Sequence, residues 1–236
     1  MTTYIAYGNI NQPFSLESLP DELIPENLYQ IETDRSRVFQ RHQCRRLAHL
    51  LLFQLLKISG KSTALLSQIH RTESGRPYFL DERIDFNISH SGDWVAVILD
   101  IRNEEKSAVG IDIEFPKIRN FTALMEHIAP KEEIDWFHHH QQDSLAAFYR
   151  CWCLREAVLK SQGFGIVKLS NVRHFPEQQK IFSDYCPQGQ LWFTDELPVY
   201  LAAFVNHQEK LPHFYEWSGE RLQLKILQEF SFYHVN

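Results

Sequence analysis

The stretch that decides the fold runs from Ser144 to Gly163 and reads SLAAFYRCWCLREAVLKSQG. It predicts a long helix over residues 144–162. The helix is expected to end there because Gly163 is a common signal for a helix C-terminus. Strand-like segments surround this helix, and a long helix packed on antiparallel strands is an α+β arrangement. The other predicted elements here are helices at residues 121–128 and 131–138 and strands at residues 109–115, 172–175, 190–193, 199–205 and 222–227.

The N-terminal part of the chain repeats this order in outline. Residues 26–58 predict a long helix in which Leu47, Leu51 and Leu55 recur at i, i+4 spacing. The remaining predicted elements are a strand at residues 2–10, a helix at residues 62–70, and two strands within residues 86–101 around a loop at residues 89–93. We therefore expect two similar α+β halves, residues 1–115 and 116–236, related by pseudo-twofold symmetry.

Composition excludes several classes of protein. The chain has 236 residues, a formal net charge of −6 and 44% hydrophobic residues, so a nucleic-acid-binding protein that relies on its global charge is not expected. The N-terminus does not resemble a signal peptide, and no apolar stretch is long enough to span a bilayer. The four cysteines form no C-x-x-C pair, so we expect free thiols in a reducing cytoplasm and no membrane association.

The first candidate site is the segment GIDIE at residues 110–114. On a strand, residues i and i+2 share a face, so Asp112 and Glu114 project together while Ile111 and Ile113 face the core. Two convergent carboxylates are hard oxygen ligands of the kind that Mg²⁺ prefers. The alternative is a solvated strand edge that carries two unrelated acids.

The second candidate site lies in the long helix of the opening stretch. Helical spacing places Trp152, Glu156 and Lys160 on one stripe at i, i+4 and i+8. A carboxylate and an ammonium one turn apart could hold a metal ion and neutralise a phosphate oxygen. An ordinary surface ion pair between Glu156 and Lys160 is the alternative, although Trp152 is a poor choice for a solvated face.

The third candidate site is FNISHSGD at residues 86–93. A Ser-His-Ser-Gly turn between strands would offer hydroxyls, an imidazole and backbone amides, which together make an anion nest. A hydrolase triad is not expected, because the adjacent side chains of Ser89 and His90 diverge. A polar hairpin turn with a structural histidine is the alternative.

A basic cluster in the N-terminal helix is the fourth candidate. Arg37, Arg41 and Arg45 form one stripe at i, i+4 and i+8, with Arg35 and Arg46 beside it. Like charges at this spacing destabilise a helix modestly, unless an anion lies across them. A solvated face balanced by nearby acids is the alternative.

The order of these motifs resembles the surfactin-activating type of 4′-phosphopantetheinyl transferase. The resemblance rests on G-R-P at residues 75–77, F-N-I-S-H-S-G at 86–92, V-G-I-D-I-E at 109–114 and W-C-L-R-E-A-V-L-K at 152–160, and it covers residues 35–165. It implies two similar α+β halves with coenzyme A bound in the cleft between them. One departure is Cys153, which stands where the family usually has Ser or Thr.

The resemblance also implies a role for each site residue. Mg²⁺ would be bound by Asp112, Glu114 and Glu156. The phosphates of coenzyme A would be contacted by Lys160 and His90, with Ser89 in the same segment. The adenosine 3′-phosphate and base would lie near Arg45 and the turn formed by Gly75, Arg76 and Pro77.

The implied reaction transfers phosphopantetheine from coenzyme A to a serine of an apo acyl or peptidyl carrier protein and releases 3′,5′-ADP. Positioning and charge neutralisation would provide most of the catalysis. Glu156 is the first candidate for the general base, and Glu114 and Glu132 follow, with alignment leaving Glu133 as an alternative to Glu132. Two other functions stay open, an Mg²⁺-dependent phosphohydrolase of a nucleotide pyrophosphate and a non-catalytic carrier-binding module. We expect a monomer.

Overall fold

The protein is described by a computed structural model that covers residues 2–29, 35–140, 143–207 and 211–236. The chain divides into two compact units, each formed by two segments. The first unit comprises Met1–Ser107 and Leu211–Ile226, and the second comprises Ala108–Lys210 and Leu227–Asn236.

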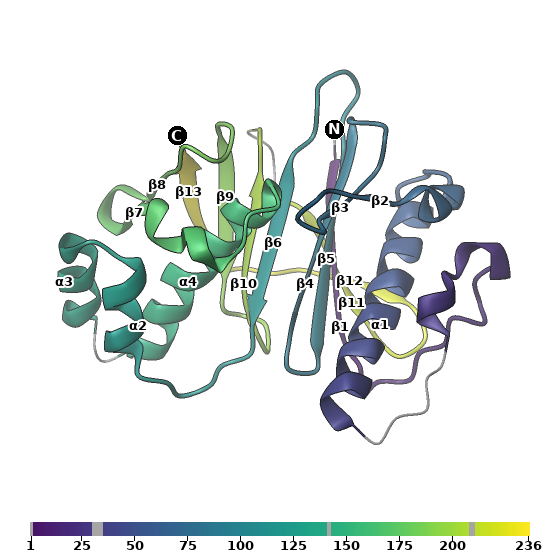
Figure 1. Ribbon diagram of the computed structural model, residues 1–236, viewed down its shortest axis with the longest axis horizontal. Coiled ribbons are helices and arrows are strands. Elements are labelled where there is room, and N and C mark those ends of the chain that lie inside the picture. The colour runs from purple at the N-terminus through teal and green to yellow at the C-terminus, as the bar shows by residue number, and fades with distance from the viewer. Residues whose placement is uncertain (1, 30–34, 141–142, 208–210) are drawn as a thin grey trace. The chain divides into compact units, whose positions relative to one another are not determined.

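The first unit is one long helix packed on a five-stranded sheet. The helix α1, Ser36–Ile58, lies along one face of the sheet (Figure 1), and Leu47, Leu51 and Leu55 are fully buried against it. The strand order is β12-β11-β1-β5-β4, in which only the β1–β11 pair is parallel. The strands are β1 (Thr2–Asn9), β4 (Ile84–Ser91), β5 (Trp94–Ile101), β11 (His213–Trp217) and β12 (Leu222–Lys225), with a small pair β2 (His70–Arg71) and β3 (Pro77–Tyr78).

The prediction of one helix over residues 26–58 is wrong at its N-terminal end. Residues Glu26–Leu28 form a short 3₁₀ helix after Pro25, and Arg35 has an extended backbone, so α1 begins at Ser36. Residues 30–34 lie outside the described part of the chain. The predicted helix at residues 62–70 is a 3₁₀ helix, Thr63–Gln68, and a third such turn covers Asp21–Leu23.

The second unit packs its helices on a six-stranded sheet with the order β6-β10-β9-β13-β8-β7. The longest helix, α4, lies against β6 and β10 (Figure 1). Its helices are α2 (Phe121–Ile128), α3 (Lys131–His139) and α4 (Ser144–Ser161), with 3₁₀ turns at Ile166–Asn171 and Pro176–Gln178. Its strands are β6 (Val109–Glu114), β7 (Arg173–Phe175), β8 (Lys180–Phe182), β9 (Gly189–Thr194), β10 (Tyr200–Val205) and β13 (Ser231–Val235).

An α+β fold with a long helix on each sheet is therefore confirmed, but the two units do not follow the predicted boundary after residue 115. Strand β6 pairs with β10, so residues 109–114 belong to the second unit. Strands β11 and β12 return to the first unit because β11 pairs with β1. The pseudo-twofold relation stays a prediction. Within the described ranges, no helix combines the length and apolar composition needed to cross a bilayer.

Candidate active site

Three carboxylates of the second unit come from β6 and α4. Asp112 and Glu114 lie two residues apart on β6, and Glu156 lies on α4, which packs against that strand. Asp112 is 3% exposed and Glu156 is 7% exposed, so neither is an ordinary surface acid. This contradicts the alternative of a solvated strand edge for Asp112.

Gly110 explains how β6 approaches α4 so closely. A Cβ atom at this position would lie 1.9 Å from the carbonyl oxygen of Ala157, a distance that no side chain tolerates. The absence of a side chain therefore lets the backbones of β6 and α4 pack together, which brings Asp112 near the helix that carries Glu156. In the sequence this glycine stands out only as part of the G-I-D-I-E motif.

Lys160 pairs with Asp112 across the two elements. Its Nζ atom donates to Asp112 Oδ1 at 2.6 Å, and its side chain is 28% exposed. Burial alone would lower the pKa of Lys160, but Asp112 and Glu156 raise it above its ordinary value, so the ammonium stays charged. The alternative of an ordinary surface ion pair between Glu156 and Lys160 is wrong, because Glu156 is buried and Lys160 pairs with Asp112 on β6.

The charges of this cluster do not balance. Burial and the nearby Asp112 raise the pKa of Glu156 to about 7, with a further contribution from Glu114, while Lys160 acts in the opposite direction. Carboxylates that repel one another in this way are stabilised when a cation binds among them. Three carboxylates and one ammonium leave an excess of negative charge that a divalent ion would offset, so the donor set fits Mg²⁺.

Cys153 lies beside this cluster. It is fully buried, and burial followed by the charges of Asp112 and Glu114 raises its pKa well above the ordinary value, so it stays a thiol. Its sulfur donates to the carbonyl oxygen of Tyr200 on β10 at 4.0 Å. A cysteine at the position of the family's Ser or Thr thus still offers a hydrogen-bond donor, although a weak one.

The first unit contains a cavity of about 480 Å³ that brings together three of the predicted residues. Arg45 from α1, His90 from β4 and Pro77 from β3 all line it. Arg71 also lines it and was not selected from the sequence. Leu52, Phe86 and Ile88 are among the apolar residues of its wall. A cavity with apolar walls and a few cationic groups is suited to a nucleotide base that carries a phosphate.

Ser89 and His90 are placed differently from the prediction. They lie on β4, which continues to Ser91, and the turn is formed by Gly92 and Asp93, with Gly92 at φ 59°. The expected loop at residues 89–93 is therefore wrong. Because side chains alternate along a strand, Ser89 is buried at 3% exposure while His90 is exposed and lines the cavity.

Two other predicted residues have internal roles. Arg76 donates to Asp85 Oδ2 at 2.6 Å, and both side chains are about nine-tenths buried. Gly75, at φ +84°, forms the preceding turn, and its carbonyl oxygen accepts from Arg71 at 2.9 Å. Arg46, which was predicted to belong to an exposed basic cluster, is also buried. It is 8% exposed and its guanidinium lies over the ring of Phe14.

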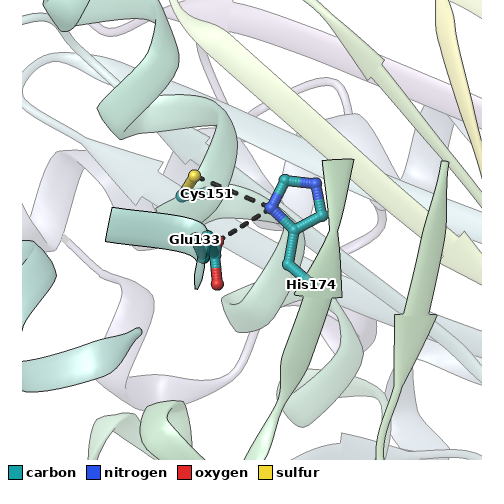
Figure 2. A group of neighbouring side chains, drawn as sticks. All are labelled: Glu133, Cys151 and His174. Carbon is teal, nitrogen blue, oxygen red and sulfur yellow. Dashed lines mark hydrogen bonds and ion pairs between the residues drawn. The ribbon is translucent and has the colours of Figure 1, made fainter. Parts of the chain in front are cut away.

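A second cluster of titratable groups lies inside the second unit. Figure 2 shows Glu133 of α3, Cys151 of α4 and His174 of β7 converging. His174 Nδ1 lies 2.8 Å from Glu133 Oε1 and 3.7 Å from Cys151 Sγ. These donors could hold a metal ion by type and spacing. However, both terminal nitrogens of the fully buried Arg155 donate to the Glu133 carboxylate, so its charge is already balanced by a guanidinium.

These contacts exclude Glu133 as a general base. Burial alone would raise the pKa of Glu133, but Arg155 and His174 lower it to about 2. Burial lowers the pKa of His174, so its imidazole is neutral and its Nδ1–H donates to the carboxylate. The acid that stays accessible in this segment is Glu132, which is exposed at the start of α3.

We expect Glu133→Gln to lower the free energy of unfolding by about 3–5 kcal/mol, because it leaves the buried charge of Arg155 without its partner. Glu132→Gln is the matched control on the neighbouring exposed position, with an expected change within about 0.5 kcal/mol. Urea unfolding of both variants measures the difference. Equal unfolding midpoints and slopes for the two would contradict the buried ion pair.

Comparison with known proteins gives a consistent result. Residues 108–208 match the family model of the 4′-phosphopantetheinyl transferase superfamily. A protein of Haemophilus influenzae, provisionally named a 4′-phosphopantetheinyl transferase, is 93% identical over 236 residues, which are 100% of both chains. The transferase AcpT of Escherichia coli K12 is 35% identical over 117 residues, 46% of this chain and 57% of its own length. The transferase ffp of Bacillus subtilis is 27% identical over 155 residues, 59% of this chain and 67% of its own length.

Proposed function

The chain belongs to the 4′-phosphopantetheinyl transferase family, whose members move the phosphopantetheine arm of coenzyme A onto a carrier protein, and we propose that the carboxylates and Lys160 of the second unit perform this transfer. One observation carries the assignment. The ion pair between Lys160 and Asp112 lies beside the buried carboxylate of Glu156, so an ammonium and two carboxylates lie close together. A pyrophosphate needs both kinds of group.

Asp112, Glu114 and Glu156 would hold Mg²⁺ in this proposal. When bound, the ion supplies charge neutralisation and electrophilic activation at the pyrophosphate of coenzyme A. Lys160 would neutralise a further phosphate oxygen, because its partly exposed ammonium is already held at the cluster.

The chemical step needs a base for the serine of the carrier. The serine oxygen forms a bond to the β-phosphorus of coenzyme A, the bond from that phosphorus to the bridging oxygen breaks, and 3′,5′-ADP leaves. The serine proton goes to a carboxylate, for which Glu156 is our first candidate, directly or through water. Glu114 is a second candidate and the exposed Glu132 a third.

The cavity of the first unit is proposed to receive the adenosine end of coenzyme A. Arg45 and His90 would face the 3′-phosphate, and the apolar wall would contact the base. Arg71 joins this group by its position in the same lining. Arg76 would act indirectly, since its ion pair with Asp85 holds the strand that carries Pro77 next to β4.

We expect the enzyme to distinguish coenzyme A from 3′-dephospho-coenzyme A through Arg45. A charge-assisted hydrogen bond is worth about 1.5–3 kcal/mol, so the apparent KM should be about 10- to 150-fold lower for coenzyme A. Arg45→Ala should remove most of this preference. Arg41→Ala is the matched control, because Arg41 lies one turn away on the same face but does not line the cavity. If the wild-type enzyme had equal KM values for both donors, the proposal that Arg45 binds the 3′-phosphate would be wrong.

The rival functions predict different products. A phosphohydrolase would release nucleotide from coenzyme A and Mg²⁺ without any carrier, whereas a transferase releases 3′,5′-ADP in proportion to the apo carrier supplied. A carrier-binding module without activity would release none. Chromatography of the nucleotide products, with and without an apo carrier and with EDTA in place of Mg²⁺, distinguishes the three.

A further inference from the structure

We propose that Glu133, Arg155 and His174 are positioning residues, which fix the rotation of α4 and thereby hold Glu156 against Asp112. The inference rests on the proposed role of Glu156 and Asp112 as metal ligands. The three residues are called the anchor network below. All of them are buried in the second unit, at 2%, 0% and 2% exposure.

The position of Arg155 in the sequence links the anchor network to the site. Arg155 and Glu156 are consecutive on α4, so their side chains leave the helix about 100° apart. One points to the carboxylate of Glu133 on α3, and the other lies beside Asp112 on β6. Any rotation of α4 about its axis that shifts Glu156 must therefore also break the contacts of Arg155.

The contacts of Arg155 are specific in direction. Two of its nitrogens bind the two oxygens of Glu133, with NH1 to Oε1 at 2.8 Å, and NH1 also donates to the carbonyl oxygen of Cys151 at 3.0 Å. A planar guanidinium that binds both oxygens of a carboxylate tolerates little rotation relative to it, whereas an apolar contact does not depend on direction. His174 binds the same carboxylate from β7, so Glu133 itself is held from a second element.

The energetics favour a role in positioning over a role in stability alone. Replacing a buried ion pair by apolar residues of similar volume is often neutral or stabilising. Stability therefore does not require a buried Arg–Glu–His group here. Small displacements at a phosphoryl-transfer site are costly, since about 1 Å of misplacement can lower the rate by about 10²-fold.

The decisive variant is the double substitution Glu133→Leu with Arg155→Met, which removes both charges and keeps the volume. We expect a modestly lower melting temperature, because the buried Nδ1–H of His174 loses its acceptor, and a kcat at saturating coenzyme A and carrier that is lower by about tenfold or more. In the free enzyme, Mn²⁺ titration followed by electron paramagnetic resonance should show about tenfold weaker binding. A double variant with wild-type kcat and wild-type Mn²⁺ affinity would overturn the proposal.

Two further variants keep the test conclusive. Asp100→Asn, in the buried Asp100–Arg102 ion pair of the first unit, should lower the melting temperature and leave Mn²⁺ affinity unchanged. If the double variant does not fold, the single variant Arg155→Lys is tested in its place. Lysine keeps the positive charge but cannot bind both oxygens of Glu133 in the way that the planar guanidinium does. We then expect weaker Mn²⁺ binding with a modest change in melting, and unchanged binding would overturn the proposal.

Two other results separate the possible failures. If the wild-type enzyme binds no Mn²⁺ and needs no divalent ion, the proposed function fails together with this inference. If Asp112→Ala loses Mn²⁺ while the double variant keeps it, only the anchor network loses its role. Stoichiometric zinc in the purified wild type that is lost in Cys151→Ser would also overturn the proposal, because the cluster would then be a metal site.

Discussion

Asp112→Ala is expected to lower the turnover of coenzyme A by more than a factor of ten and to leave the fold intact. The substitution removes one of the three proposed metal ligands and the hydrogen-bond partner of Lys160. Lys160 keeps access to water because its side chain is 28% exposed, so no charge is left in the core. The wild-type far-ultraviolet circular dichroism spectrum should therefore be retained.

The measurement is the initial rate of 3′,5′-ADP release at millimolar Mg²⁺, with circular dichroism of the same preparation. More than about a tenth of the wild-type rate, a loss below about 1.4 kcal/mol of transition-state stabilisation, would contradict the metal assignment. Asp135→Ala on α3 is a suitable control, because it removes an acid that belongs to neither cluster.

Lys160→Ala is expected to lower kcat by a factor on the order of 10² or more, as for the loss of one charge-stabilising donor. Glu156→Gln should be at least as damaging, because it weakens the metal site and removes a candidate base. The double variant should lose much less than the product of the two single losses, since residues that act as a unit are non-additive. If the residues were only an ion pair, each change would cost about 0.3–0.5 kcal/mol of stability and nothing in rate.

The measurement is kcat for coenzyme A with a saturating apo carrier, together with thermal melts of the three variants. Near-normal rates with small losses of stability would contradict the mechanism. Because Glu156 is 7% exposed, Glu156→Gln should also show whether a neutral side chain relieves repulsion from Asp112. A higher melting temperature for this variant without metal is the expected sign of that relief.

Local spacing predicted the parts of the site that depend on one element. Alternation along a strand placed Asp112 beside Glu114, and the helical repeat placed Glu156 near Lys160. Local spacing could not predict that Lys160 pairs with Asp112, because β6 and α4 come together only in the tertiary structure. Gly110 was the available signal, since a glycine inside a strand often marks a close approach of another backbone.

Other features depend on contacts that no local pattern records. The strand β11 returns to β1 after more than a hundred residues, so the boundary between the units could not be placed from the order of elements. The loop was predicted to begin at Ser89, whereas β4 continues to Ser91 and the turn lies at Gly92. The polar side chains of Ser89 and His90 are typical of a loop, although both residues lie on a strand. Arg155 did carry a signal: an arginine among apolar residues of a helix is rarely buried without a charged partner, which here is Glu133.

Intact mass spectrometry of an apo carrier protein, incubated with coenzyme A, Mg²⁺ and the enzyme, tests the central claim most directly. We expect one phosphopantetheinyl group to be added to the carrier, and no addition when its acceptor serine is replaced by alanine or when the enzyme carries Asp112→Ala. An unchanged carrier mass across acyl and peptidyl carriers, with coenzyme A either intact or hydrolysed, would contradict it.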